Sequence, residues 1–362
     1  MAQSPGDRVA ATHLEYDAVI ATRNRPDALA LSLPLLVGQT RPPRRLIVID
    51  SSDDHAPVAA AVAKSVTGWN GDLVIEHSAK GLPLQRNRGL AHVTAPVVLF
   101  PDDDSLLYPD AAEQILAVYE RDRDAAIAAV CALEAMEPPG DASAGAFSYV
   151  VADAETRKRR FRGVQGRIER KFTWLKPAKI LGRHLNARHA VPEWLGEVEA
   201  RPVEYMTGFR MSFRTHAIRR TGFDEALRDY GLYEDIDASF SAGESGLVVA
   251  AWRSKIYHHR FPGARANGRA LGMIEVLNMV YVILKHATPE RLGTRQAGLV
   301  RRRLAGFVPL RVAADLVGVG SAFGRQRLIG AATAALWSGR LWRAAGDTLA
   351  DVYRTAMSRG AS

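Results

Sequence analysis

Cysteine is almost absent from this chain of 362 residues, in which Cys131 stands alone. A single thiol excludes an intramolecular disulfide framework and a zinc site built from cysteines, and it fits a reducing compartment. The first twenty residues carry Asp7, Glu15 and Asp17 and no apolar run, so we expect no secretory signal peptide. Apolar runs of about 20 residues are also lacking, since Leu271–Lys285 is too short to span a bilayer unaided. We therefore expect a cytoplasmic protein, either soluble or bound peripherally to the inner face of the plasma membrane.

Charge is unevenly distributed along the chain. Hydrophobic residues make up 47% and charged residues 24%, which excludes a disordered protein, and the length allows about two folded units. The net charge is +9, yet Glu155–Arg188 and Arg265–Ser362 are strongly basic and the remainder is acidic. Such segments are either solvated faces or surfaces for phosphate groups, anionic lipid or nucleic acid. We expect no nucleic-acid partner, because no zinc-finger, helix-turn-helix or RNP-type motif accompanies the charge.

The first third of the chain alternates short apolar runs with helical patterns, which is typical of βαβ units and a parallel sheet. Predicted strands are Asp17–Thr22, Arg45–Asp50, Leu73–Glu76, Pro96–Phe100 and Ala125–Leu133. Predicted helices are Asp27–Val37, Ala56–Val66, Leu84–His92 and Tyr108–Arg121. Ligands bind beyond the carboxyl ends of such strands, so Thr22, Asp50 and the acidic triplet Asp102–Asp104 are expected on one edge.

The rest of the chain divides into three parts. Residues 138–202 have weak periodicity and are interpreted as a long basic excursion on the acceptor side. Order then returns, with strands predicted at Met211–Phe213 and Leu247–Ala251 and helices at Thr215–Thr221 and Tyr233–Ala242. After Arg265 the pattern is helical, with Leu271–Lys285 apolar nearly all round and an amphipathic helix across Leu341–Ala356. We therefore predict a tail over residues 1–14, an α/β domain over 15–264 and a basic helical region over 265–362.

Asp102–Asp104 is the sharpest chemical feature. Adjacent carboxylates raise one another's pKa unless a cation is bound, and Mg²⁺ or Mn²⁺ is commonly held by carboxylates and diphosphate oxygens. The alternative is an acidic turn that caps the next helix. Because strand neighbours point to opposite sides, only one of His258 and His259 could complete the site, and we favour His259. The alternative for either histidine is an ordinary surface position.

Glu234 and Asp235 begin a predicted helix. One interpretation is structural, in which one acid caps the helix and the helix dipole stabilises the charge of the other. The other interpretation is that one of them is a general base that deprotonates an acceptor hydroxyl.

Weaker candidates lie on neighbouring segments. Asp50 could hold a ribose or base, or cap a turn. Arg86 and Asn87 could reach phosphate, or form a solvated helix face. Gly208, after a predicted strand, could let a sugar approach the backbone, or form a simple bulge.

Six motifs in order resemble the family 2 inverting nucleotide-sugar glycosyltransferases. The motifs are Val19–Pro26, Gln39–Pro43 with Leu46–Asp50, Gln85–Gly89, Val97–Asp104, Gly208–Arg214 with Gly222–Glu225, and Tyr233–Asp237. They extend over roughly Asp17–Arg260. The resemblance implies a GT-A fold, which is a Rossmann-like, mostly parallel central sheet flanked by helices, here with a C-terminal helical extension.

The resemblance also implies residue roles. Asp104 would ligate the metal, Asp102 or Asp103 would contact ribose and metal, and Asp235, beside Glu234, would be the base. Residues implied at the nucleotide sugar are Thr22, Arg23, Asn24, Arg25, Asp50, Arg86, Asn87, Asp102, Asp103 and Gly208, and those at the metal are Asp102, Asp104 and His259. A divalent cation, Mn²⁺ or Mg²⁺, would neutralise charge on the departing nucleoside diphosphate.

Two departures from the family pattern bear on specificity. The family often has a second acid directly after the residue that corresponds to Asp50, whereas Ser51 stands here. The excursion over residues 138–202 is long, so the family's acceptor-binding residues cannot be assigned to positions in this chain. Beyond the resemblance, Trp337, Trp342 and spaced arginines suit an interfacial helix on anionic lipid. The alternative is a helical extension that packs on the catalytic domain or forms a dimer.

We therefore expect an inverting, metal-dependent transferase. It would move a sugar from a nucleotide-sugar donor to a hydroxyl of a saccharide or lipid-linked acceptor in polysaccharide or glycolipid synthesis. A sugar-phosphate nucleotidyltransferase is the enzymatic alternative, but it would carry a Gly-rich loop after the first strand, and Thr22–Pro26 has no glycine. The second alternative is a carbohydrate-binding protein of the same fold without catalytic activity. The intact Asp102–Asp104 and Asp235 argue against it.

Overall fold

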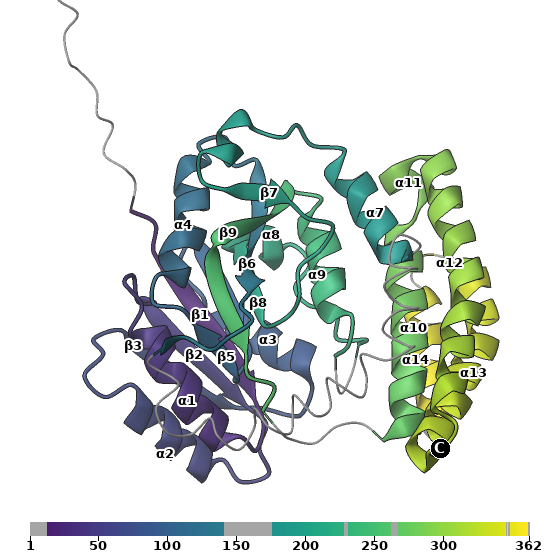
Figure 1. The fold of residues 1–362 in the computed structure, drawn as a ribbon, viewed down its shortest axis with the longest axis horizontal. Helices are drawn as coiled ribbons and strands as arrows, with labels where there is room; N and C mark the ends of the chain where they lie inside the picture. Colours follow the sequence, from purple (N-terminus) through teal and green to yellow (C-terminus); the bar gives the residue numbers. More distant parts are fainter. Residues whose placement is uncertain are drawn as a thin grey trace, which may run out of the picture.

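The computed structural model describes residues 13–140, 176–227, 231–261, 267–344, 346 and 348–360. Within these ranges, nine strands form one mixed sheet in the order β3-β2-β1-β4-β8-β6-β9-β5, and β7 pairs with β9 (Figure 1). The strands are β1 Tyr16–Thr22, β2 Arg45–Asp50, β3 Asp72–His77, β4 Val97–Pro101, β5 Ser105–Leu107, β6 Ile127–Glu134, β7 Ala200–Pro202, β8 Arg210–Arg214 and β9 Leu247–His258.

The amino-terminal half of the sheet is parallel, as the alternation of strands and helices predicts. β1 pairs in parallel with β2 and β4, and β2 pairs in parallel with β3. The helices around it are α1 Pro26–Val37, α2 Ala56–Ser65, α3 Leu82–His92, α4 Ala111–Arg121, α8 Thr215–Arg219 and α9 Glu234–Ala242. α1, α2 and α4 cover one face of the sheet, and α3, α8 and α9 cover the other. Burial on both faces explains the continuous apolar runs of β2 and β4.

The carboxyl-terminal half differs from the prediction in three places. The chain reverses after Asp104 and forms β5, which pairs antiparallel with β9. β9 continues to His258 instead of ending at Ala251, because β5, β6 and β7 all pair with it. Gly208 lies in a turn before β8 and does not follow a strand. The first two differences depend on strand pairings between residues far apart in the sequence.

The predicted excursion rejoins the fold before its end. Residues 141–175, which hold most of the basic segment with Phe161, Phe172 and Trp174, lie outside the described residues. After them come α7 Pro177–Asn186, the 3₁₀ helix η3 Glu193–Gly196 and β7. The last part of the excursion therefore belongs to the sheet. Of the predicted tail, residues 1–12 also lie outside the described part.

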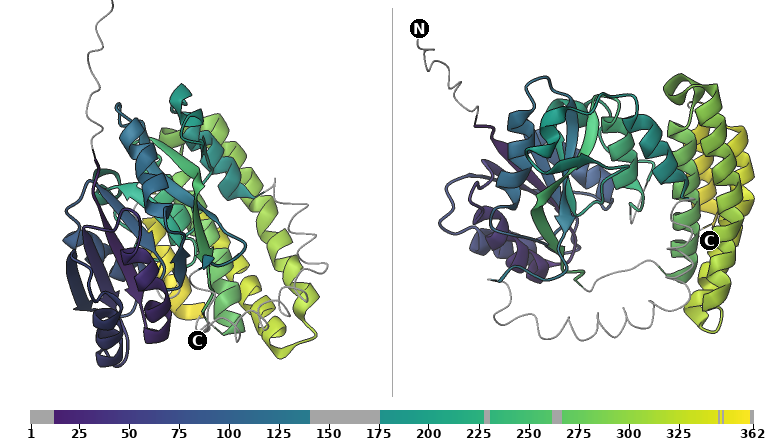
Figure 2. Two further views of the ribbon diagram at one scale, coloured as in Figure 1. Left: turned by 60° about the vertical axis from the view of Figure 1, so that its left-hand side comes forward. Right: turned by 45° about the horizontal axis from the view of Figure 1, so that its top comes forward.

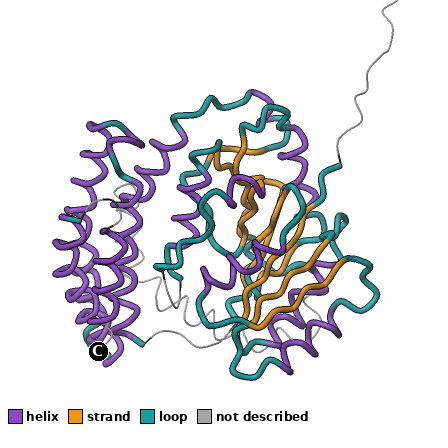
Figure 3. The backbone as a smooth tube through the Cα atoms, turned by 180° about the vertical axis from the view of Figure 1, so that it is seen from behind, coloured by secondary structure: helices purple, strands orange, loops and turns teal. Residues whose placement is uncertain are grey.

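The C-terminal region is a layer of helices beside the sheet, with α7 packed against it (Figures 1 and 3). The helices are α10 Gly268–His286, α11 Pro289–Leu292, α12 Thr294–Ala314, η4 Asp315–Gly318, α13 Ala322–Arg343 and α14 Thr348–Gly360. α10 is buried along most of its length, as predicted. The continuous helix predicted across Leu341–Ala356 is wrong, since α13 ends at Arg343. Among the described helices, none is long and apolar enough to cross a bilayer.

Two glycines let α10 and α13 cross closely. A Cβ on Gly272 would lie 2.0 Å from the Arg327 carbonyl oxygen, and one on Gly330 would lie 2.0 Å from the Arg269 carbonyl oxygen. Both obstacles are backbone atoms, which cannot rotate away. The absence of side chains at these two positions therefore sets the spacing of the two helices.

Polar contacts join the helical layer to α9 and to the segment before it. Lys285 Nζ lies 2.8 Å from Asp224 Oδ2 and 2.9 Å from Asp237 Oδ2. Burial opposes ionisation of Asp237, but Lys285 and His286 outweigh it and lower its pKa to about 2. Asn278 of α10 donates to the Leu232 carbonyl at 2.6 Å, two residues before α9. The helical layer thus supports the start of α9.

Gly272→Ala is expected to lower the free energy of unfolding by about 1–3 kcal/mol, because the added methyl overpacks the crossing. Gly306→Ala is the matched control. Gly306 lies in α12, and a Cβ there would meet no atom within 4 Å. That change should raise stability by about 0.5–1 kcal/mol, since alanine is the better helix former. Urea unfolding of both variants checks the pair, and equal effects would contradict the close crossing.

Candidate active site

The acidic triplet forms a tight turn between β4 and β5, at the edge where the sequence predicts it. Ser105 stabilises the turn, because its Oγ accepts from the Asp102 N–H at 2.9 Å and donates to the Phe209 carbonyl at 2.8 Å. Asp103 and Asp104 are buried, and Asp102 is half-buried. Successive side chains of the turn point in different directions, so the three carboxylates have different surroundings.

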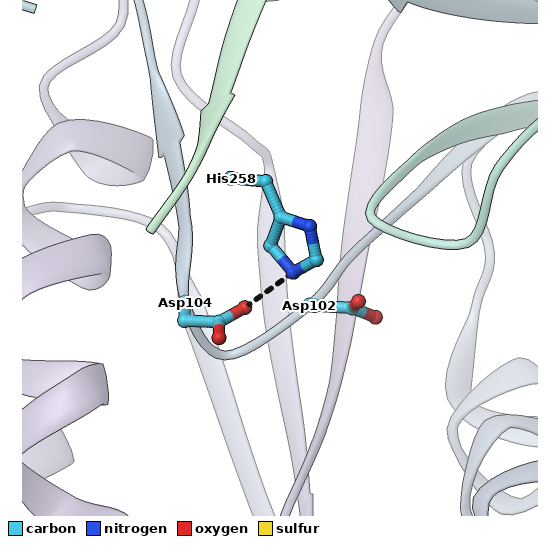
Figure 4. A group of neighbouring side chains, drawn as sticks. All are labelled: Asp102, Asp104 and His258. Carbon is cyan, nitrogen blue, oxygen red and sulfur yellow. Dashed lines mark ion pairs between the residues drawn. The ribbon is translucent and has the colours of Figure 1, made fainter. Parts of the chain in front are cut away.

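Asp102 and Asp104 lie with His258 in a group that could hold a cation (Figure 4). One ligand atom from each residue lies within 4.8 Å of the other two. His258 Nε2 is 3.3 Å from Asp104 Oδ1, and its ring stacks on Phe209 at 4.5 Å between centroids. Burial opposes ionisation of both groups, but their mutual attraction prevails, lowering the pKa of Asp104 and raising that of His258.

His259, the expected third ligand, does not join this group; the structure brings His258 to the carboxylates instead. β5 pairs Ser105 with His258, which sets that histidine beside the acidic turn. The His259 N–H donates to the Asp104 carbonyl at 3.1 Å, and its buried ring lies between Tyr257 and Phe261. Neighbouring side chains alternate, as the sequence argument assumed, but the register that selects one of them depends on the β5–β9 pairing.

Asp103 has a different set of partners. Its carboxylate accepts from Thr22 Oγ1 at 2.8 Å and from Arg25 Nη1 at 3.1 Å, and its carbonyl accepts from Ser32 Oγ at 2.7 Å. Burial raises the pKa of Asp103 to about 7. Asp103 therefore ties the acidic turn to the loop after β1, and it brings Arg25 within 3.7 Å of Asp104.

Arg86 of α3 joins the two sides of the site. The buried guanidinium donates to Asp102 Oδ1 at 2.8 Å and to Glu234 Oε1, and it lies over the Phe223 ring at 5.4 Å. Burial raises the pKa of Glu234 to about 8 against the attraction of Arg86. Glu234 Oε2 is buried with no hydrogen-bond partner among the described residues. The sequence argument left Arg86 either as a phosphate contact or on a solvated helix face. The structure buries it and gives it two carboxylate partners, so the solvated face is wrong.

Asp235 lies half-buried at the start of α9. Its Oδ2 accepts from the Gly208 N–H at 2.9 Å, and its Oδ1 accepts from the Ile236 N–H at 2.8 Å. Burial raises the pKa of Asp235. A Cβ on Gly208 would come within 3.3 Å of Glu234 Oε1 and 3.4 Å of Arg86 Nη2. Any larger residue would therefore crowd the ion pair between Glu234 and Arg86. The turn before β8 and the start of α9 thus hold Asp235 between them.

The residues expected at the nucleoside form a bonded network beside β2. Asp50 is fully buried, accepts from Ser52 N–H at 2.9 Å and lies 2.7 Å from His55 Nδ1. The exposed Asp53 binds Arg23 at 2.9 Å and Asn24 at 2.7 Å. Asp50 therefore holds the turn, and Asp53 and His55, which the sequence argument did not select, lie further out. A search for acids after the strand end would have included Asp53.

Asn87 is also occupied by the protein. Its amide donates to the Phe223 carbonyl and to Glu225 Oε1, both at 2.8 Å, and its Oδ1 accepts from the Phe223 N–H at 2.7 Å. These hydrogen bonds hold the segment around Phe223 and Glu225 against α3. In this arrangement Asn87 supports the site and does not point a free amide toward a phosphate.

A mixed sheet with an acidic turn at the end of a central strand is the architecture of GT-A glycosyltransferases. Residues 17–176 match the family model Glycosyl transferase family 2. The matched stretch contains the first four of the six motifs, and the family match there agrees with the resemblance that the motifs predict.

Comparison with solved structures supports the fold. The chain is similar to the mannosyltransferase PcManGT from Pyrobaculum calidifontis in complex with GDP-Man and Mn2+, at TM-score 0.50 and 16% identity over 96% of this chain and 86% of that one. It is also similar to S. aureus TarS 1-349 in complex with UDP, at TM-score 0.50 and 12% identity over 96% and 92% of the two chains. No curated protein matches the sequence.

His258→Gln should weaken Mn²⁺ binding at least tenfold, because it removes a nitrogen from the group formed with Asp102 and Asp104. His259→Gln is the matched control and should leave binding nearly unchanged. Electron paramagnetic resonance of free Mn²⁺ during titration measures both affinities. The opposite order of effects would return the ligand role to His259.

Proposed function

We propose that this chain transfers a sugar from a nucleotide-sugar donor to an acceptor hydroxyl with inversion at the anomeric carbon. The observation that carries the proposal is that carboxylates approach one site from two opposite sides. Asp102 and Asp104 come from the strand edge, Asp235 comes from the start of α9, and Arg86 links the two sides. An acidic cation site beside a separate half-buried carboxylate is what transfer to a hydroxyl requires.

The donor set fits a divalent cation. Two carboxylates and one imidazole suit Mn²⁺ well, and the carboxylates alone suit Mg²⁺. Asp102, Asp104 and His258 would hold the ion, and the bound ion would neutralise charge on the diphosphate leaving group. His258 is paired with Asp104 and would have to be neutral to bind a metal, so cation binding should release a proton.

Asp235 is the proposed general base. The acceptor oxygen forms a bond to the anomeric carbon, the bond from that carbon to the phosphate oxygen breaks, and the hydroxyl proton passes to the Asp235 carboxylate. The Gly208 N–H fixes Oδ2 of that carboxylate, which supports a defined approach of the hydroxyl. Glu234 is proposed to act through Arg86, because its side chain is buried against that guanidinium.

The donor pocket is proposed to lie along the edge from Asp53 to the acidic turn. Arg23, Asn24 and Arg25 follow β1 at this edge, and Arg25 lies 3.7 Å from Asp104, where it could meet a phosphate. Thr22 and Asp50 support the edge from beneath through Asp103 and Ser52. The acceptor is proposed to be a saccharide or a lipid-linked sugar of polysaccharide or glycolipid synthesis.

Nucleotide binding should depend on the cation. A thermal-shift screen of UDP, GDP, dTDP and CMP, each with Mn²⁺ or with EDTA, should give a shift for one nucleotide in Mn²⁺ alone. At a hundredfold excess over its dissociation constant, a ligand of the native state adds about 2.7 kcal/mol of stability. Equal shifts in EDTA would argue against the metal site, and no shift with any nucleotide would favour a binding protein with another ligand.

Asp235→Asn should lower the transfer rate by about 10²–10⁴-fold, the usual contribution of a general base, while donor binding persists. Glu244→Gln is the control and should transfer at the normal rate, because Glu244 follows the end of α9 and pairs with Arg220 and Arg291, away from the proposed base. Nucleoside diphosphate release measures the rates, and nuclear magnetic resonance of the product reports the anomeric configuration. Near-normal transfer by Asp235→Asn would show that another group takes the proton.

A further inference from the structure

Large apolar side chains are exposed mainly in one part of the molecule, the hairpin formed by α12, η4 and α13. Of the eleven such side chains among the described residues, seven lie in this hairpin. They are Leu310, Leu316, Val317, Val319, Phe323, Ile329 and Leu336. Residues 316–324, which form the turn and the start of α13, contain no charged side chain. Isolated exposed apolar residues are ordinary, but a concentration at one turn marks an interaction surface.

The apolar surface continues along α13. Ile329, Ala332 and Leu336 follow one another at spacings of three and four residues, and all three are exposed, Leu336 by 83%. The same stripe begins at Arg325 and ends near Arg343. The opposite face of α13 is the one that packs on α10. The fold therefore leaves this stripe uncovered, with arginine at both ends.

The exposed charge on the hairpin is entirely positive. Thr294–Arg343 contains nine arginines and one acidic residue, Asp315. Asp315 is buried and pairs with Arg311 at 3.0 Å and Arg327 at 3.2 Å. The hairpin therefore exposes no carboxylate. An apolar stripe bordered by arginine alone complements an anionic bilayer, since apolar side chains enter the interface while guanidinium groups meet lipid phosphates.

We propose that this hairpin, residues 294–343, is a docking surface for anionic membrane, and that the turn carrying Leu316, Val317 and Phe323 enters the interface. Trp337 and Trp342, the anchors suggested by the sequence, are partly buried against the helical core, so the turn takes that role.

The turn of the hairpin lies beside the start of α10. A Cβ on Gly268, the first residue of α10, would lie 2.5 Å from the Phe323 carbonyl oxygen, so α10 begins beside the turn. α10 starts ten residues after His258. In Figures 1 and 2 the turn lies at the end of the helical layer where α10 begins. Docking there would present the transferase to a lipid-linked acceptor, and only that consequence rests on the proposed function.

Flotation of the full-length chain with phosphatidylcholine vesicles, alone or mixed with phosphatidylglycerol, tests the proposal without donor or acceptor. The wild type should float with the anionic vesicles, and binding should weaken as salt rises. The double change Leu316→Glu and Val317→Glu should lower the partition coefficient at least tenfold. Val191→Glu is the matched control, because Val191 is 57% exposed against 56% for the two turn residues and lies outside the hairpin.

Two further variants keep the test decisive. Arg302→Gln with Arg343→Gln should reduce both the binding and its salt dependence. Leu336→Glu should weaken binding even if the double change at the turn impairs folding, which circular dichroism would reveal. Unchanged flotation of the turn and Leu336 variants, or no flotation of the wild type, would overturn the proposal.

A second copy of the chain is the competing occupant of the surface. A wild-type dimer that dissociates on Leu336→Glu and does not bind vesicles would overturn membrane docking in favour of self-association, and light scattering distinguishes the two. Sugar transfer to a soluble acceptor is measured separately. A failure of catalysis is therefore distinct from a failure of docking.

Discussion

The buried guanidinium of Arg86 holds the site together. It contacts Asp102, which belongs to the acidic turn, and Glu234, which begins α9, so it lies between carboxylates from opposite sides of the site. Without it, the two acids would face each other across a poorly solvated space, and burial already raises the pKa of both. The ion pairs allow the acidic turn and the start of α9 to approach each other closely, as the proposed transfer requires.

The rest of the structure supports this arrangement at a distance. Tyr233 stands at φ 76° directly before Glu234, a left-handed conformation that is costly for a bulky residue and needs support. Asn278 provides it by binding the Leu232 carbonyl, and Tyr353 in turn donates to Asn278 at 2.5 Å. The C-terminal helices thus support the start of α9, which carries the proposed base, and also carry the proposed membrane surface. The inner face of these helices supports α9, and the outer face carries the proposed membrane surface.

Much of the fold follows from local pattern. The strands from Tyr16 to Pro101 and the helices between them lie close to their predicted bounds. The apolar runs of β1, β2 and β4 are buried on both faces of a parallel sheet, which makes them easy to detect, whereas β3 at the sheet edge is partly exposed. The same reasoning brought Thr22, Asp50 and the acidic triplet to one edge. It did not give β5, the extension of β9 or the break before α14, since these depend on partners distant in the sequence.

The sequence by itself predicted the likeness to family 2 glycosyltransferases, the parallel half of the sheet and the edge that carries the acidic triplet, because motifs, periodicity and strand ends are local properties. Only the tertiary structure decided that His258 and not His259 meets the carboxylates, that Arg86 binds acids, and that Asp50 is sealed beneath its turn. It also decided that the tryptophans of α13 pack inward while the neighbouring turn is exposed. Register and burial settle such choices, and both arise only when segments far apart along the chain come into contact.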